Sequence, residues 1–239
     1  MTLELRRSSG RPLVIGHRGA GAVAPENTIA SFEAAIAAGV DLVEFDVSPG
    51  LRVAHDPEQA GPGAPSLDDV LALLASAGVG AHVDLKSPGY EAETVEAIRR
   101  HGLGERALVS TAFAVTARRV RRLAPDLPLA IGYPRDRHGV SRLPWPPVVT
   151  QAGAGALRAV MPWRVPLLLR RSQATVLALH HALCSPASIA AAHRAGVPVF
   201  AWTANDPATV RRLVSAGADA IVSDDPQVVL HVLATLSAA

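Results

Sequence analysis

Short β-type runs alternate with helical patterns along the whole 239-residue chain. Eight principal β segments separated by helices, in a chain close to the usual length of about 250 residues, are typical of a (β/α)8 barrel. A doubly wound open sheet is the alternative, but no glycine-rich dinucleotide fingerprint follows an early strand. We therefore predict an α/β chain that folds as one (β/α)8 (TIM) barrel domain over residues 1–239. The predicted strands are 12–16, 40–47, 81–86, 107–111, 128–133, 175–181, 197–203 and 219–224.

Apolar periodicity and capping residues predict the helices between these strands. Ser66, for example, is a good N-cap, and Asp68 and Asp69 lie in the first turn after it, where the helix dipole favours acids. A proline-rich stretch, 134–175, predicts one long helix and a loop, and 51–55 predicts a short additional extended piece. The other predicted helices are 28–39, 66–78, 93–102, 114–124, 186–196, 207–217 and a last one from Pro226.

Composition excludes several classes of protein. Hydrophobic residues make up 49% of the chain, enough for a full-sized core, and the formal charge of only +2 argues against bulk attraction to nucleic acid. Cys184 is the single cysteine, so internal disulfides and zinc sites built on cysteine pairs are excluded. The basic pairs are spread along the chain, and we expect them on solvated helix faces: Arg118-Arg119, Arg121-Arg122, Arg170-Arg171 and Arg211-Arg212.

The sequence predicts no targeting or membrane segment. Its N-terminus lacks the apolar core of a signal peptide. The longest apolar stretch, Val148 to Leu169, is interrupted by charged and proline residues, which argues against a membrane span. We therefore expect a cytoplasmic protein without stable membrane insertion, and the sequence leaves its oligomeric state open.

Polar residues gather where the first two predicted strands end, which in a barrel is the functional face. His17 and Arg18 follow the first strand. Glu44 and Asp46 lie two residues apart and share one face of the second strand, which we expect to point into the barrel. Two neighbouring acids without a cation would cost stability, and a hard divalent cation such as Mg²⁺ or Ca²⁺ removes that cost. A salt bridge to Arg18 or Lys86 is the alternative.

The third strand repeats this arrangement, because His82, Asp84 and Lys86 also share one face. Asp84 could supply a third carboxylate to a metal site. Lys86 would place a positive charge near a phosphate, or near the acids. His82 lies one step deeper, and we expect a hydrogen-bonded interior histidine there rather than a ligand.

Four further residues lie at or near the ends of other predicted extended segments. His55 precedes an Asp-Pro turn, and with His17 it would give the two imidazoles, one giving and one taking a proton, that suit a displacement at phosphorus. Trp202 could form the apolar wall of a substrate pocket or could pack in the ordinary way. Ser223 and Asp224 are expected to be strand-to-helix capping residues without a catalytic role.

With these residues in view, the chain resembles the glycerophosphodiester phosphodiesterase family, whose barrel is of the phospholipase C-like kind. "GHRGAGAVAPENTIASFEAAIAAGVDLVEFDV" (16–47) is similar to the family's N-terminal signature. The similarity extends through "HD" (55–56), "VDLK" (83–86) and "AGVPVFAWTANDPATVRRLVSAGADAIVSDDP" (195–226), and is weak only over 134–175. The resemblance implies His17 and His55 as acid–base pair, Arg18 and Lys86 as phosphate contacts, Trp202 as a wall of the alcohol pocket, Glu26 as a site-ordering residue, and Glu44, Asp46 and Asp84 as ligands of one Ca²⁺ or Mg²⁺.

The resemblance also implies a reaction, the metal-dependent hydrolysis of a glycerophosphodiester to glycerol 3-phosphate and an alcohol. Three features depart from the family pattern. Asp84 stands where the family usually has glutamate, the connection from Asp46 to His55 is shorter, and "PEQAGPGAPS" (57–66) replaces an Arg-Thr-Thr segment. The family's helical insertion is also missing, which predicts a more open mouth. The alcohol could therefore be choline, ethanolamine, glycerol, inositol or a lysolipid.

Three other functions remain open at this stage. The enzyme could act on lysolipids as a lysophospholipase D-type phosphodiesterase. Lys86, at a strand end, could instead form a Schiff base of the aldolase kind, although this explains neither the three inward carboxylates nor Arg18. A non-catalytic barrel that binds phosphorylated ligands is the third reading, although such a protein needs neither a metal nor two acid–base groups.

Overall fold

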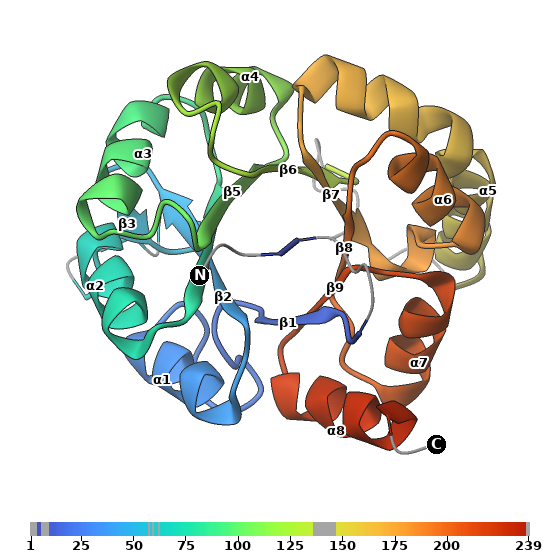
Figure 1. Ribbon diagram of the computed structural model, residues 1–239, viewed down its shortest axis with the longest axis horizontal. Coiled ribbons are helices and arrows are strands. Elements are labelled where there is room, and N and C mark those ends of the chain that lie inside the picture. The colour runs from blue at the N-terminus through green and yellow to red at the C-terminus, as the bar shows by residue number, and fades with distance from the viewer. Residues whose placement is uncertain are drawn as a thin grey trace.

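The computed structural model describes residues 4–5, 10–135 except 57, 59 and 62, and 147–237. Within these ranges, eight parallel strands form a closed ring, because the first strand pairs with the second on one side and with the last on the other. Helices surround this ring on all sides (Figure 1). The predicted (β/α)8 barrel is therefore confirmed, and the doubly wound open sheet is wrong.

The elements alternate as the sequence predicted. Around the ring, the strands are β1 (Leu13–Gly16), β2 (Leu42–Ser48), β4 (Gly80–Leu85), β5 (Ala107–Thr111), β6 (Leu129–Tyr133), β7 (Val176–His180), β8 (Val199–Trp202) and β9 (Ala220–Ser223). The helices are α1 (Ile29–Ala38), α2 (Leu67–Ala77), α3 (Glu91–Arg100), α4 (Ala114–Leu123), α5 (Pro147–Ser172), α6 (Pro186–Arg194), α7 (Pro207–Ala216) and α8 (Pro226–Ser237), with a short 3-10 turn η3 (His181–Leu183) before α6.

Two segments refine the prediction. The extended piece expected over 51–55 is only the two-residue strand β3 (Arg52–Val53), which pairs antiparallel with the end of β2. The long helix expected within 134–175 is α5, and residues 136–146 of that stretch lie outside the described part of the chain. Ser66 caps α2 as predicted, because its hydroxyl accepts a hydrogen bond from the backbone N–H of Asp69.

The barrel interior changes from apolar to polar along the strands. A buried interior cluster includes Leu42, Leu108 and Phe200. Because side chains two residues apart share a face, the next inward positions on the same strands are Glu44, Ser110 and Trp202. The apolar layer therefore forms a floor, above which Trp202 and the polar side chains of Glu44 and Ser110 face the C-terminal ends of the strands.

The outward faces of the strands pack against the helices. Val43, Phe45 and Val47 of β2 are fully buried in this outer layer, and the Phe45 ring meets that of Phe32 from α1 edge-on at 5.8 Å. This packing holds the odd-numbered side chains of β2 outward and therefore directs Glu44 and Asp46 inward, as the alternation predicted.

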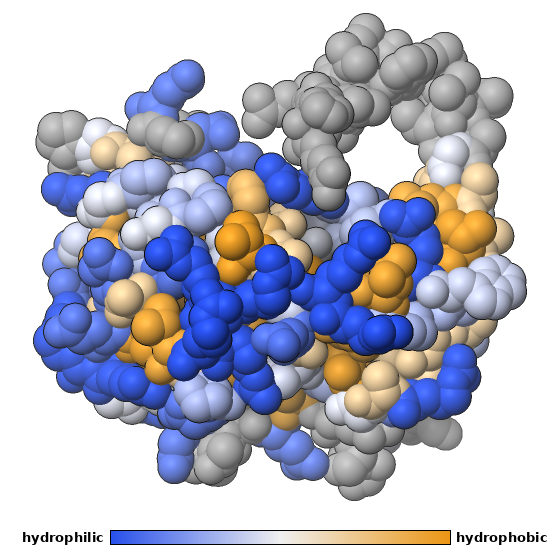
Figure 2. All heavy atoms as spheres, turned by 90° about the horizontal axis from the view of Figure 1, so that it is seen from above, coloured by the Kyte–Doolittle hydropathy of each residue, from blue (hydrophilic) through white to orange (hydrophobic). Residues whose placement is uncertain are grey.

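Hydrophilic side chains cover much of the face seen in Figure 2, with hydrophobic ones scattered between them. Of the predicted arginine pairs, two lie on α4, one on α5 and one on α7, and Arg118 of α4 donates a hydrogen bond to the backbone carbonyl of Arg171 on α5. In the described part of the chain, no helix is both long and apolar enough to cross a membrane.

Cys184 provides a direct test of the packing between η3 and α6. Its thiol is fully buried, and burial raises the pKa of Cys184 to about 12. We expect the folded protein to resist a disulfide reagent such as Ellman's at pH 8, because only the accessible thiolate reacts. The same protein in denaturant should release one equivalent of thiolate product. Rapid labelling of the folded protein would contradict this packing.

Candidate active site

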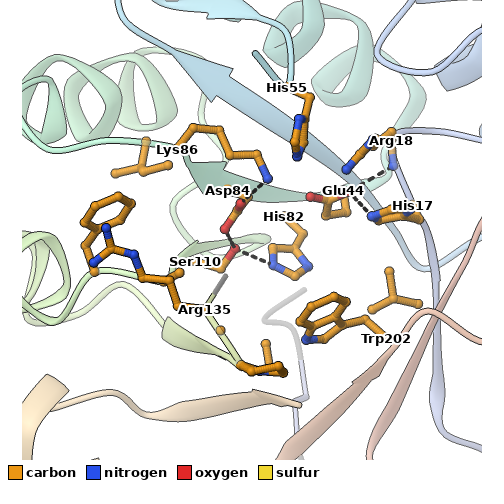
Figure 3. A pocket seen from close by; sticks show the side chains of 17 residues that line it. His17, Arg18, Glu44, His55, His82, Asp84, Lys86, Ser110, Arg135 and Trp202 are labelled. Atoms are coloured by element: carbon orange, nitrogen blue, oxygen red, sulfur yellow. Dashed lines mark hydrogen bonds and ion pairs between the residues drawn. The ribbon is translucent and has the colours of Figure 1, made fainter. Parts of the chain in front are cut away.

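A pocket of about 650 Å³ opens at the C-terminal ends of the strands. It collects residues from distant parts of the sequence (Figure 3). Glu26 and Asp46 do not line it but contact side chains that do. The other predicted site residues are all in its lining: His17, Arg18, Glu44, His55, Asp84, Lys86 and Trp202.

A sharp loop after β1 places His17 and Arg18 at this mouth. Arg18 has φ +50° and Gly19 has φ +89°, both in the left-handed region. A Cβ atom on Gly19 would lie 2.5 Å from Ser31, so only glycine fits there. The turned backbone lets the N–H of Arg18 donate to Glu44 Oε2 at 2.9 Å. The loop is thus fastened to β2 at its inward carboxylate.

His17 is held by a carboxylate from the opposite end of the chain. Its Nδ1 lies 2.5 Å from Asp224 Oδ1, while its Nε2 lies 3.9 Å from Glu44 Oε2. Burial alone lowers the pKa of His17, but the charge of Glu44 and the hydrogen bond to Asp224 outweigh it and raise that pKa above its usual value.

Asp224 therefore does more than the capping role expected for it. Besides His17, its carboxylate accepts a hydrogen bond from Asn205 Nδ2 at 2.5 Å. Ser223 behaves as expected, because its hydroxyl accepts from the backbone N–H of Asp225 at the start of α8. The strand-end motif predicts a local cap, but it does not show this contact across the barrel closure.

Three carboxylates converge below the mouth. One carboxylate oxygen from each of Glu44, Asp46 and Asp84 lies within 4.8 Å of the other two. Burial and the neighbouring Asp46 raise the pKa of Glu44 to about 7. Burial likewise favours neutral Asp84, but Lys86 and Ser110 outweigh it and lower the pKa of Asp84 to about 2.

Lys86 and Arg18 offset the charge of these acids. Lys86 Nζ lies 2.5 Å from Asp46 Oδ1 and 2.7 Å from Asp84 Oδ2, and Arg18 Nε lies 2.9 Å from Asp46 Oδ2. The salt bridge considered from sequence as the alternative to a metal is therefore present. Burial disfavours the Lys86 ammonium, but the two aspartates raise its pKa above the usual value.

The carboxylate cluster also fits a hard divalent cation. All its donors are oxygens, the type that Ca²⁺ and Mg²⁺ prefer. Asp46 Oδ1 is buried and accepts no hydrogen bond among the described residues, although Lys86 Nζ is close to it. The residues can therefore hold either an ion-paired network alone or one that includes a cation.

Ser110 and His82 continue the network along the pocket floor. The Ser110 hydroxyl donates to Asp84 Oδ1 at 2.6 Å and lies 2.9 Å from His82 Nε2. His82 is only 4% exposed, and burial lowers its pKa to about 4, so the expected interior histidine is confirmed. Sequence reasoning missed Ser110; the signal for it is its inward position on β5, in register with Asp84.

Asn27 is the second residue that sequence reasoning missed. Its Nδ2 donates to Asp46 Oδ2 at 2.9 Å, and its Oδ1 accepts from the backbone N–H of Asp46 at 3.1 Å. The adjacent Glu26 pairs with Arg18 Nη1 at 2.5 Å, in keeping with the ordering role expected of it. Glu26 and Asn27 are neighbours in the segment "PEN" (25–27). The position of Asn27 beside a predicted site residue was therefore the sequence signal that could have identified it.

His55 enters the pocket from the loop that follows β3. Its Nδ1 lies 3.2 Å from Asp56 Oδ1, and about a third of its side chain (32%) is exposed. The structure thus brings His55 into the same pocket as His17, even though the connection between β2 and His55 is short.

Comparison with known proteins identifies the family. The model of the "Glycerophosphoryl diester phosphodiesterase family" matches residues 17–49 and 89–228, which is more than half of the chain. The chain belongs to this family. The resemblance seen in the sequence is confirmed, and so is the expected class, an enzyme that hydrolyses phosphoric diesters.

Individual relatives agree with the glycerophosphoryl diester phosphodiesterase assignment. A glycerophosphodiester phosphodiesterase of Caldanaerobacter subterraneus is 26% identical over 93% of this chain and 98% of its own. Two solved structures at 22% identity share the fold. One, a putative phosphodiesterase of this kind from Silicibacter pomeroyi, covers 97% of this chain and 96% of its own with a TM-score of 0.74. The other, an Oleispira antarctica phosphodiesterase in complex with the product sn-glycerol-3-phosphate, covers 93% and 97% with a TM-score of 0.71.

The gap in the family match coincides with the departures noted in the sequence. Residues 50–88 are not matched, and they include His55, Asp84 and Lys86. The inclusion of His55, Asp84 and Lys86 in the candidate site therefore depends on the geometry of the pocket and not on the family match.

Lys86 is the only lysine among the 23 basic residues of the chain, which makes the Schiff-base alternative easy to test. An imine needs a neutral amine, whereas two carboxylates hold Lys86 as an ammonium. We expect borohydride reduction with carbonyl substrates to add no mass to the Lys86 peptide. Formaldehyde and borohydride applied to the unfolded chain should modify it, as a positive control. A substrate adduct on Lys86 in the folded protein would contradict this assignment.

Proposed function

We propose that this chain hydrolyses glycerophosphodiesters to glycerol 3-phosphate and an alcohol, with His17 and His55 as the acid–base pair. The observation that carries the proposal is the position of His17. Its Nδ1 is engaged by Asp224, and its ring lines a pocket that also contains Arg18, Lys86 and His55. The family assignment and the product complex of the Oleispira relative support the same substrate class.

Arg18 and Lys86 bind and orient the phosphate in this proposal. Each carries a positive charge into the pocket lining, and each is fixed by carboxylates, so little reorganisation is needed when an anion arrives. Glu26 positions Arg18 through their ion pair. Trp202 provides the apolar wall beside the alcohol.

Glu44, Asp46 and Asp84 would hold one divalent cation, Ca²⁺ or Mg²⁺. A cation bound there would supply positive charge that stabilises the negative charge developing on the phosphate. Asn27 positions Asp46, and Ser110 positions Asp84, through the hydrogen bonds described above.

Two proton transfers complete the reaction. The Nδ1–H of His17 donates to Asp224, which leaves Nε2 as the atom that can exchange a proton with substrate. One histidine removes the proton of the attacking oxygen, from water or from the neighbouring glycerol hydroxyl. The other gives a proton to the alcohol oxygen as its bond to phosphorus breaks. Attack by the glycerol hydroxyl passes through a cyclic phosphate, which water then opens.

Release of glycerol 3-phosphate tests this function. We expect turnover of at least one glycerophosphodiester with Ca²⁺ or Mg²⁺, its loss in EDTA, and a fall of at least about 100-fold for His17→Ala. A lysolipid belongs in the same panel, because its hydrolysis would identify the lysophospholipase D alternative. Tight binding of diesters without turnover under any metal would favour the non-catalytic barrel and contradict the proposal.

Asp224 should act as a positioning residue for His17. Asp224→Asn keeps the size of the side chain but removes the charge that stabilises the His17 imidazolium and fixes its tautomer. We expect kcat to fall at least about 100-fold with KM changed less than about threefold. Asp225→Asn is the matched control, since it makes the same chemical change one residue away. Equal effects of the two variants, or a change confined to KM, would contradict this role.

A further inference from the structure

The pocket has a second side that the proposed chemistry does not use. We call it the far wall and define it by Ala112 and Phe113, which follow β5, and Pro134 and Arg135, which follow β6. In the ring order β6 lies four strands from β1 in either direction, so the far wall is opposite His17 and Arg18. Figure 3 shows Arg135 on the side of the pocket away from these two residues. A phosphate bound near His17 would leave its alcohol group to reach this wall.

Arg135 dominates the far wall. Its side chain is exposed, and its guanidinium carbon lies 3.8 Å from the centre of the Phe113 ring. A cation already covers this ring face, so the face is closed to a second cation such as a choline ammonium. The stacking also holds the planar guanidinium, which carries five N–H donors, at the edge of the pocket.

No carboxylate offsets this charge within the described residues. Both acids of the pocket lining, Glu44 and Asp84, lie on the β2–β4 side and are engaged there by Arg18 and Lys86. Arg135 has no ion pair with any residue of the described ranges. A cationic head group would therefore meet a guanidinium that no carboxylate of the described residues offsets, whereas an anionic one would meet a partner with fork-shaped geometry.

We propose that Arg135 selects glycerophosphodiesters whose alcohol carries an anionic group, a carboxylate or a phosphate monoester, against those with a quaternary ammonium. This inference rests on the proposed function, because it names the substrate class of the same pocket. Phe113 acts as the platform that positions the Arg135 guanidinium.

Four diesters of glycerol 3-phosphate test the selection. In glycerophosphoglycerol the alcohol is neutral, and in glycerophosphocholine it carries a cation. The other two diesters are anionic at the alcohol. One has glycerate in place of the glycerol alcohol and so carries a carboxylate, and the other is glycerophosphoglycerol with a phosphate monoester on the terminal hydroxyl of that alcohol. We expect the wild type to show kcat/KM at least about tenfold higher for an anionic alcohol than for choline. Arg135→Gln should reduce that ratio to near one, and Arg135→Glu should invert it. Comparison of kcat/KM between the carboxylate-bearing and the phosphate-bearing diester shows which anion is preferred.

Arg164→Gln is the matched control. Arg164 also stacks over an aromatic ring, that of Tyr133 at 5.6 Å, but neither residue belongs to the pocket lining. We expect this variant to keep the wild-type ratio. A wild type that prefers choline, a ratio that Arg135→Gln does not change, or an equal change in Arg164→Gln would overturn the proposal.

Binding separates this inference from the proposed function. Dissociation constants of the four diesters measured calorimetrically on His17→Ala, and on His17→Ala combined with Arg135→Gln, do not depend on turnover. If wild type hydrolyses none of the diesters but binding shows the Arg135-dependent ratio, the proposed function fails and the selection stands. If hydrolysis occurs without any charge preference in rate or binding, the selection fails and the function stands.

Discussion

The ammonium of Lys86 between Asp46 and Asp84 is the interaction on which the site depends. Three acids lie together inside the barrel, and buried carboxylates at this spacing would raise one another's pKa and destabilise the fold. Lys86 contacts two of them, and Arg18 contacts Asp46 from the other side. The only lysine of a chain otherwise supplied with arginines stands at this position. A compact ammonium fits between two aspartates, where a planar guanidinium needs more room.

The barrel makes this arrangement possible through strand register. Asp46 of β2 pairs in register with Asp84 of β4, and Asp84 with Ser110 of β5, so one inward layer carries three polar side chains in a row. Directly below, Glu44 and His82 form the preceding layer. The apolar floor lies beneath, and its Phe200 ring meets the His82 ring edge-on at 6.2 Å. Most of these polar groups therefore have partners in the same layer, in the neighbouring layer or in the loop after β1.

The sequence alone predicted which side chains of a strand point into the barrel, because this depends only on alternation along that strand. Glu44 and Asp46 are inward because Val43, Phe45 and Val47 pack outward, and this is visible in the order of residues. Contacts set by barrel closure were not visible. Asp224 reaches His17 only because β9 pairs with β1, and Asn27 reaches Asp46 only because the loop after β1 folds back at Arg18. The sequence shows which side chains face inward but not which loops close over them.

Asp84 shows how a departure from the family pattern is accommodated locally. A carboxylate shorter by one methylene has less reach, but both of its oxygens are engaged, by Ser110 on one side and Lys86 on the other. The shorter side chain is thus held in the layer that it forms with Asp46 and Ser110.

The two sides of the pocket differ in how their charges are balanced. On the side formed by β1, β2 and β4, each charged side chain of the pocket lining has a partner of opposite charge or a hydrogen-bond partner. The β5 and β6 side has no such set, because Arg135 there rests on an aromatic ring without a carboxylate among the described residues. The first side is constrained by charge balance inside the barrel, whereas the second is the side on which the proposed selection by Arg135 acts.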